Sequence, residues 1–302
     1  MRLILLALLA LTAACVAPVV QSAGTVGPDL LGPDGGAIPV ETVTEDGVTL
    51  RGGFVDAGPG APVVLHLLPS AASTSTGVPA GIGRVGLAGT LATLRALGWS
   101  SLVLDYRGVG RSGGTRDARR LVADGRAMWG EAVRRAGGAP DRVVLRATSL
   151  GTLVAAELLA TEGAGQGAPR AAALAAPVRA ATVVRNGARE RHGAVAAWWA
   201  GLLHSAPNVP ELEDVVASER VPLLLVLSEN DGYLPPAETE RVRRAALEAG
   251  HEAVVLDGDH ARTVLRTWGM DVVQAGFSGR RTPELLDAER RFLAWVAPPA
   301  PE

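Results

Sequence analysis

Residues 142–152 read RVVLRATSLGT, and this stretch decides the fold. An apolar run breaks into a small polar turn, and apolar residues then resume as LVAAELLA. The first part has the pattern of a buried strand and the second that of a helix. A serine at a helix start is often only a cap, because its hydroxyl accepts a hydrogen bond from a free backbone N–H. Ser149 is therefore either a capping residue or a nucleophile held at the end of a strand.

The composition bounds the classes of protein to consider. The chain has 302 residues with 48% hydrophobic content, enough for one substantial α/β domain. Basic and acidic residues number 29 and 31, without a run of like charge, so nothing indicates a nucleic-acid partner. Every basic residue is arginine, which excludes a Schiff-base lysine. The sequence has no H-E-x-x-H motif or Cys/His cluster, so we expect no metal site.

The N-terminal residues have the layout of an export signal. MRLILLALLALTAAC places one basic residue before an apolar run that is too short to span a bilayer, then small residues and Cys15. Cys15 is the sole cysteine, and its setting resembles the lipid-attachment box of bacterial lipoproteins. The resemblance implies a signal peptide over 1–14 and a lipid anchor on Cys15, and the residues that follow, rich in Pro, Gly and Ala, indicate a flexible tether over 15–36. The alternative is an ordinary secretory signal and a secreted soluble protein.

The rest of the chain alternates between strand and helix patterns. Two extended stretches flank Asp46-Gly47, a dipeptide that favours a hairpin turn. Apolar runs then alternate with amphipathic helical patterns as far as a last helix near residue 296. The pattern predicts an α/β fold with an eight-stranded, mostly parallel sheet covered by helices on both faces. We expect this domain to span 37–297, followed by a Pro-rich tail over 298–302.

In such sheets ligands bind beyond the carboxyl ends of the strands, so the residues after each strand are candidates for the site. Asp231 follows VPLLLVLS, with Glu229 as a nearby alternative acid, and His260 follows EAVVLDG. Each has a simpler explanation, since an Asp-Gly pair forms turns and a loop histidine is commonly solvated. Taken together with Ser149, they give the order serine, acid, histidine along the chain.

These motifs resemble those of the α/β-hydrolase family over about residues 38–296. ATSLG resembles its G-x-S-x-G elbow, with Ala147 in place of the first glycine, and residues 105–113, DYRGVGRSG, resemble its D-x-R-G-x-G-x-S segment. The resemblance implies an α/β-hydrolase fold with Ser149 as nucleophile, His260 as general base and Asp231 as orienting acid. It implies no cofactor.

An oxyanion hole needs two hydrogen-bond donors. The family resemblance assigns one to the backbone N–H of Leu150 and the other to the loop after the third strand, where Leu67 or Leu68 would supply it. His66 precedes them, and we expect a buried structural histidine bonded to loop backbone. Arg146 lies just before the elbow, where an internal ion pair or recognition of an acidic substrate group would explain it.

The family carries its cap between the sixth and seventh strands, which places a small helical cap here over about residues 179–220. Trp198, Trp199 and Leu202 fall in one apolar helical stretch and would suit an acyl chain, unless they only pack the cap onto the domain.

The sequence thus predicts an exported, lipid-anchored serine esterase acting on a small-molecule ester through an acyl-enzyme. A peptidase or amidase of the same fold, and a non-catalytic binding protein of the cell envelope, are the alternatives. Nothing in the sequence sets the oligomeric state.

Overall fold

The computed structural model describes residues 36–70, 74, 84–161, 167–186, 189, 209–218, 221–268 and 283–296. The expected signal peptide at 1–14, Cys15, nearly all of the tether and the tail at 298–302 lie outside this part of the chain. Among the described residues, no helix has both the length and the apolar character needed to cross a membrane.

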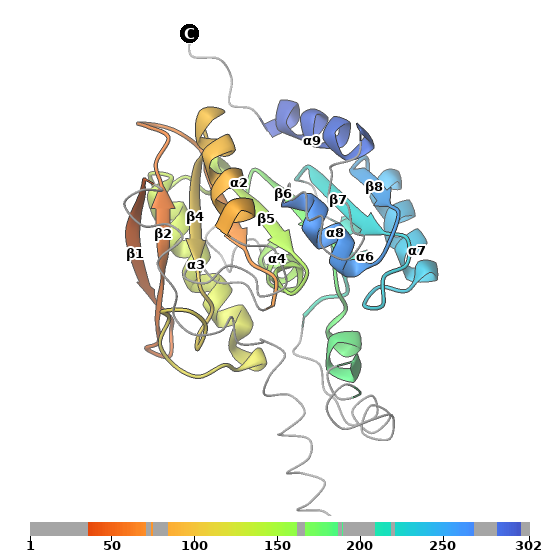
Figure 1. Ribbon diagram of the computed structural model, residues 1–302, viewed down its shortest axis with the longest axis horizontal. Helices are drawn as coiled ribbons and strands as arrows, with labels where there is room; N and C mark the ends of the chain where they lie inside the picture. The colour runs from red at the N-terminus through yellow and green to blue at the C-terminus, as the bar shows by residue number, and fades with distance from the viewer. Residues whose placement is uncertain are drawn as a thin grey trace, which may run out of the picture.

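The centre of the molecule is one eight-stranded sheet with the order β1-β2-β4-β3-β5-β6-β7-β8 (Figure 1). β1 pairs antiparallel with β2, and β2 with β4, while the remaining neighbours are parallel. The strands are β1 Ala37–Val43, β2 Thr49–Val55, β3 Val63–Leu67, β4 Ser100–Leu104, β5 Val143–Thr148, β6 Ala171–Ala175, β7 Leu223–Ser228 and β8 Glu252–Leu256. The predicted α/β-hydrolase fold class is confirmed.

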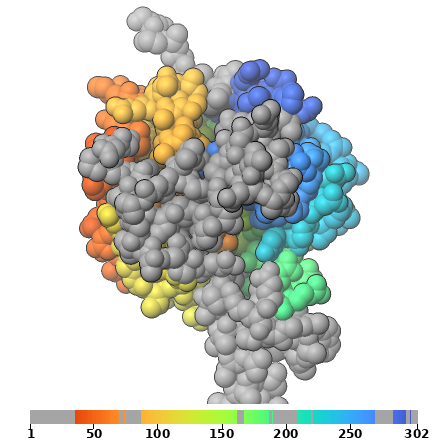
Figure 2. Space-filling model, in the orientation of Figure 1, coloured from red at the N-terminus to blue at the C-terminus, as the bar shows by residue number. Residues whose placement is uncertain are grey.

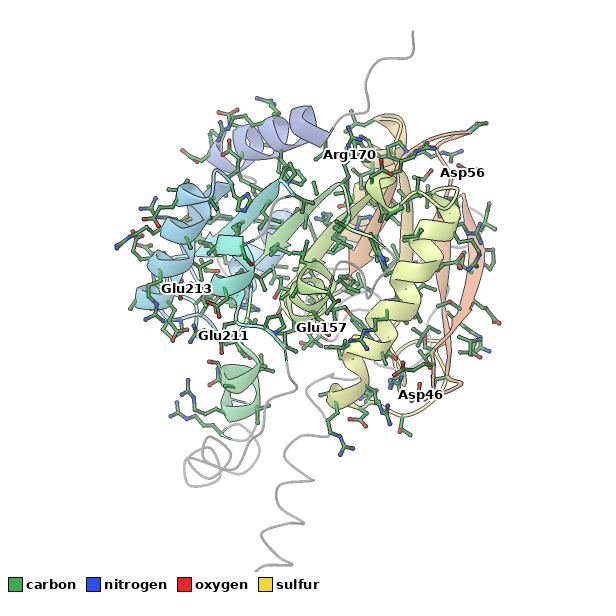
Figure 3. The ribbon with its side chains drawn as sticks, turned by 180° about the vertical axis from the view of Figure 1, so that it is seen from behind. Asp46, Asp56, Glu157, Arg170, Glu211 and Glu213 are labelled. Carbon is green, nitrogen blue, oxygen red and sulfur yellow. The ribbon has the colours of Figure 1, made fainter. Side chains whose placement is uncertain are left out.

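Helices cover both faces of the sheet, as its apolar strands require. The α-helices are α2 Arg84–Ala96, α3 Leu121–Arg135, α4 Gly151–Ala160, α6 Leu212–Ser218, α7 Pro236–Glu248, α8 His260–Thr267 and α9 Pro283–Val296. Figure 1 shows α2, α8 and α9 in front of the sheet, and Figure 3, seen from behind, shows α3 and α4 on the opposite face. The outer surfaces of α2 and α9 remain visible in the space-filling view (Figure 2).

Alternate residues of the central strands supply the two halves of the core. In β3, Val63 and Leu65 belong to the large apolar cluster that includes α3 and α4. Val64 belongs to a second cluster that joins Val144 to Phe292 of α9. Because central strands such as β3, β4 and β7 are buried on both faces, they are held firmly and their carboxyl ends form a rigid edge. Loops at that edge carry the candidate site.

Candidate active site

Ser149 lies on the turn between β5 and α4 and has a φ of 51°, which is uncommon for a residue other than glycine. Such a conformation costs about 1–3 kcal/mol and persists only where the surroundings enforce it. Here the Ser149 N–H donates to the carbonyl of Ala175 at 2.9 Å, and the Thr152 N–H and hydroxyl both donate to the Ser149 carbonyl. Leu150, not Ser149, occupies the N-cap position of α4.

The turn is so tight that Gly151 has no room for a side chain. A Cβ on Gly151 would lie 2.2 Å from the carbonyl oxygen of Leu67 at the end of β3. The second glycine of the elbow is therefore required sterically. Ala147, which replaces the first glycine, is fully buried in β5 and pairs in register with Leu67.

His260 is the first residue of α8 and lies across the sheet edge from the elbow. Its Nε2 is 2.7 Å from the Ser149 Oγ, and its Nδ1 is 2.8 Å from Oδ2 of Asp231. Because an ionised carboxylate only accepts hydrogen bonds, Nδ1 is the donor to Asp231 and Nε2 is left to accept the serine proton. The structure thus brings the three predicted residues together in a single hydrogen-bonded chain.

Asp231 is buried, and other groups hold its carboxylate in place. Its Oδ1 accepts the backbone N–H groups of Tyr233 and Leu234 at 2.7 and 3.3 Å, and its Oδ2 also accepts the Ser228 hydroxyl at 3.1 Å. Glu229, the alternative acid, is exposed. Geometry therefore favours Asp231 over Glu229 as the partner of His260.

The residues predicted to supply the oxyanion donors lie beside the Ser149 turn. Leu150 begins the turn into α4, where the first N–H groups of a helix have no partner within it and carry partial positive charge. Leu67 ends β3 and Leu68 follows it, and both are buried. The close approach of Leu67 to Gly151 places this chain end beside the elbow.

Comparisons with known proteins agree with this architecture. Residues 85–211 match a hydrolase family model described as serine aminopeptidase, S33. An uncharacterized protein of Mycobacterium tuberculosis is 30% identical over 268 residues, which cover 88% of this chain and 81% of that protein. The chain belongs to the α/β-hydrolase family.

Solved structures similar to this α/β-hydrolase include both esterases and peptidases. An esterase of Pyrococcus furiosus has a TM-score of 0.58 at 19% identity, covering 86% of this chain and 90% of the esterase. An acylaminoacyl peptidase of Pyrococcus horikoshii has a TM-score of 0.56 at 14% identity, covering 86% of this chain but 41% of the peptidase. At these identities the likeness concerns the fold.

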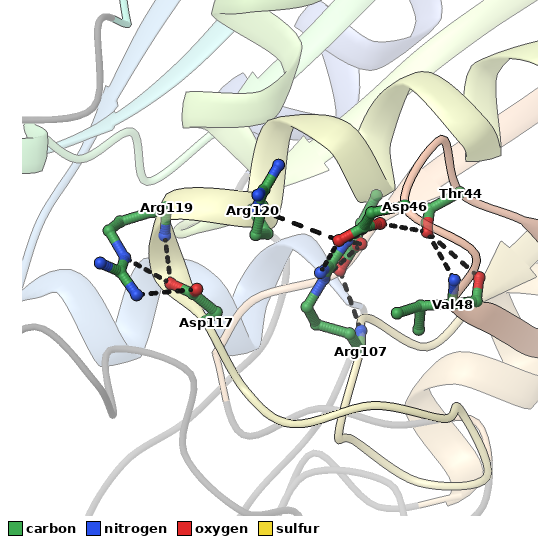
Figure 4. Close-up of polar contacts among 8 residues, drawn as sticks. Thr44, Asp46, Val48, Arg107, Asp117, Arg119 and Arg120 are labelled. Carbon is green, nitrogen blue, oxygen red and sulfur yellow. Dashed lines mark hydrogen bonds and ion pairs between the residues drawn. The ribbon is translucent and has the colours of Figure 1, made fainter.

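The DYRGVGRSG loop of this α/β-hydrolase ties neighbouring segments together through buried polar contacts. The Arg107 guanidinium donates to Asp124 and to both carboxylate oxygens of Asp46 in the β1–β2 turn (Figure 4). Asp105, fully buried, accepts the N–H and hydroxyl of Thr74 at 2.6 and 2.8 Å. Thr74 belongs to the connection that follows β3, so Asp105 fixes a point on the predicted oxyanion loop.

The expectation for His66 is half right. The side chain is fully buried, but its Nε2 lies 3.3 Å from the Ser101 hydroxyl on β4 rather than against loop backbone. In the parallel pairing of β3 with β4, His66 is opposite Val103 and Ser101 is opposite Val64, so the two side chains are diagonal neighbours on one face of the sheet. Burial, with a smaller contribution from Arg146, holds the pKa of His66 well below its ordinary value, so this histidine is neutral.

Trp198, Trp199 and Leu202 lie outside the described residues, so their place in a substrate pocket stays a prediction. The described start of the cap region is helical over 180–186. Asn186 there donates to the carbonyl of Gly232 at 3.1 Å, which ties this segment to the loop that carries Asp231. In the described part of the chain, no group of three or more His, Cys, Asp or Glu residues could hold a metal ion.

Sequence reasoning missed the residues that support the histidine and the acid. The Tyr233 ring lies 4.7 Å from the His260 ring, centroid to centroid, and Ser228 donates to Asp231. Their nearness to Asp231 in the sequence was the available signal. Asp259, next to His260, is exposed and caps α8 by accepting the Arg262 N–H at 2.9 Å.

Proposed function

We propose that this chain is a serine esterase in which Ser149 is the nucleophile, His260 the general base and Asp231 the orienting acid. The observation that carries the proposal is the continuous hydrogen-bonded chain from the Ser149 hydroxyl through His260 to a buried carboxylate. A serine hydroxyl is a weak nucleophile until a neutral imidazole accepts its proton, and the geometry supports this because the His260 imidazole lies within hydrogen-bond distance of the hydroxyl.

In the proposed reaction the Ser149 oxygen attacks the ester carbonyl carbon while Nε2 of His260 takes the hydroxyl proton. Asp231 stabilises the imidazolium, and the backbone N–H of Leu150 with that of Leu67 or Leu68 stabilises the oxyanion. The C–O bond to the leaving alcohol breaks as His260 returns the proton to that oxygen. Water, deprotonated by His260, then cleaves the acyl-enzyme and releases the acid and free Ser149.

A peptidase or amidase is the second candidate function. The family model's description as a serine aminopeptidase and the fold shared with an acylaminoacyl peptidase favour it. The chemistry of the triad is the same, and the difference lies in the leaving group. Parallel turnover assays with acyl esters of increasing chain length and with aminoacyl amides separate the two. Faster hydrolysis of the amides would replace the esterase proposal.

Covalent labelling with a fluorophosphonate probe tests the nucleophile and also the non-catalytic alternative. We expect the wild type to take up one label and Ser149→Ala to take up none, because the probe reacts only with an activated serine. Ser218→Ala is the matched control, since Ser218 is exposed on α6 and bonds only to that helix's own carbonyls among the described residues. An unlabelled wild type, or equal labelling of Ser149→Ala, would overturn the assignment.

We propose further that the protein is exported and anchored through a lipid on Cys15. The support is the sequence alone: a short apolar run after one basic residue, then small residues directly before the sole cysteine. The site would then face substrates at the cell envelope.

A further inference from the structure

The helix that carries His260 is short, and contacts hold it at both ends. α8 spans His260–Thr267, with Asp259 as its N-cap and Trp268 as its C-cap. At the N-terminal end the Asp259 side chain accepts the Arg262 N–H. At the C-terminal end the helix meets Arg146 of β5, whose Nη2 donates to the Thr267 carbonyl at 2.6 Å.

Arg146 makes a second contact with the same end of α8. Its guanidinium carbon lies 4.0 Å from the centroid of the Trp268 ring, which is a cation–π geometry. Trp268 is buried, so the ring cannot move away without opening the core. A cation is also favoured at a helix C-terminus, where the last carbonyls carry partial negative charge.

Arg146 lies on the strand that leads into the nucleophile, three residues before Ser149. β5 ends at Thr148 and leads directly into Ser149. The strand whose Arg146 contacts the end of α8 therefore also positions the nucleophile. The contact between this strand and the C-terminal end of α8 therefore contributes to the distance between the Ser149 hydroxyl and His260 at the start of the helix.

We propose that Arg146 is a positioning residue that sets His260 against Ser149 by anchoring the C-terminal end of α8. The inference rests on the proposed function, because it takes His260 as the general base. Arginine suits this role since its planar fork donates in the plane and stacks on a ring with its face, which the lysine ammonium does not do.

The surroundings of the anchor fit a fixed cation. His66, the register partner of Arg146 on β3, places its ring 6.0 Å from the Trp268 ring. Because His66 is buried and neutral, it adds no like charge against the guanidinium. Within α8, Arg266 donates to the carbonyl and carboxylate of Asp257, just after β8, which restricts rotation of the helix.

Two measurements on Arg146→Met and Arg146→Lys test the proposal. Hydrogen exchange reports the anchor whether or not the enzyme is active, and the rate of fluorophosphonate labelling reports the placement of His260. We expect Arg146→Met to exchange the α8 amides about tenfold faster while α4 is unchanged, and to label about 10- to 100-fold more slowly. Arg146→Lys should recover part of both, because lysine can still donate to the Thr267 carbonyl.

Arg135→Met is the matched control. Arg135 also stacks on a ring, 4.9 Å from the Phe54 centroid, and pairs with buried Glu131, but it lies on α3 away from α8. In Arg135→Met we expect both the exchange rate of the α8 amides and the labelling rate of Ser149 to stay within about twofold of the wild type. If Arg146→Met does not fold, Trp268→Leu removes the other half of the contact and should change both readouts in the same direction.

The outcomes separate this inference from the proposed function. Unchanged α8 exchange in Arg146→Met, or in Trp268→Leu where that variant replaces it, would overturn the anchor. Faster α8 exchange with labelling at the wild-type rate would overturn the positioning role. A wild type that does not label removes the esterase proposal and the positioning role with it, while faster α8 exchange would still establish Arg146 as the helix anchor.

Discussion

At the scale of single residues, Asp231 offers the sharpest test of the triad. Asp231→Asn keeps the shape of the side chain but replaces a carboxylate oxygen with an amide, which favours the wrong tautomer of His260 and leaves the imidazolium unstabilised. We expect kcat/KM for an acyl ester to fall by about 10³- to 10⁴-fold with little change in the fold. Glu229→Gln is the control and should stay near wild type, because Glu229 is exposed. The reverse ranking would move the acid role to Glu229.

The sequence indicated the three hydrogen-bonded residues of the candidate site, but not the residues that support them. Ser149, Asp231 and His260 were each identifiable because a strand-to-loop boundary precedes each one and chain order restricts the combinations. Tyr233 and the Arg146–Trp268 pair were not, since their contacts depend on how α8 packs on the sheet. Arg146 and Thr267 are 121 residues apart, and no local sequence pattern predicts the hydrogen bond between them.

At the scale of elements, the β1–β2 hairpin is tied to the rest of the sheet by charge. Asp46 lies in the turn of this hairpin. Its carboxylate accepts hydrogen bonds from the Arg107 guanidinium at 2.7 and 3.0 Å and from the Thr44 hydroxyl at 2.6 Å (Figure 4). Arg107 and then Thr44 hold the pKa of Asp46 well below its ordinary value of 3.8. Arg107 also bonds to Asp124, whose pKa burial raises.

This network predicts a pH dependence of stability. A carboxyl whose pKa is lower in the folded state stabilises the fold fully above its unfolded pKa, near 3.8, and loses that contribution as the pH falls below it. The raised pKa of Asp124 acts in the opposite direction in both proteins, so we compare wild type with Asp46→Asn rather than reading the pH dependence of the wild type alone. We expect the difference in unfolding free energy between wild type and Asp46→Asn to be largest above about pH 4 and to shrink below it.

Urea unfolding of both proteins between about pH 3 and pH 7 measures this difference. Asp287→Asn removes a comparable but exposed pair with Arg290 on α9 and should show a much smaller effect throughout. An Asp46→Asn difference that is flat with pH, or that grows towards acid, would contradict the assignment.

At the scale of the whole molecule, the class of fold was predictable and the arrangement of strands was not. Alternating strands and helices predicted a mostly parallel sheet with two covered faces, and the hairpin at Asp46-Gly47 was placed correctly. β3 and β4 are exchanged in the sheet relative to their order in the sequence, and no local sequence pattern indicates which strands become neighbours.

The proposed lipid on Cys15 predicts how the whole molecule is attached to the membrane. The apolar run before Cys15 is too short to span a bilayer, so a cleaved protein would depend on the lipid for membrane attachment. We expect the wild type to sediment with membranes and to incorporate labelled palmitate, and Cys15→Ser to do neither. Ser22→Ala, in the expected tether, is the control and should behave as wild type. Equal membrane fractionation of Cys15→Ser, or no palmitate in the wild type, would leave an ordinary secretory signal as the better explanation of this N-terminus.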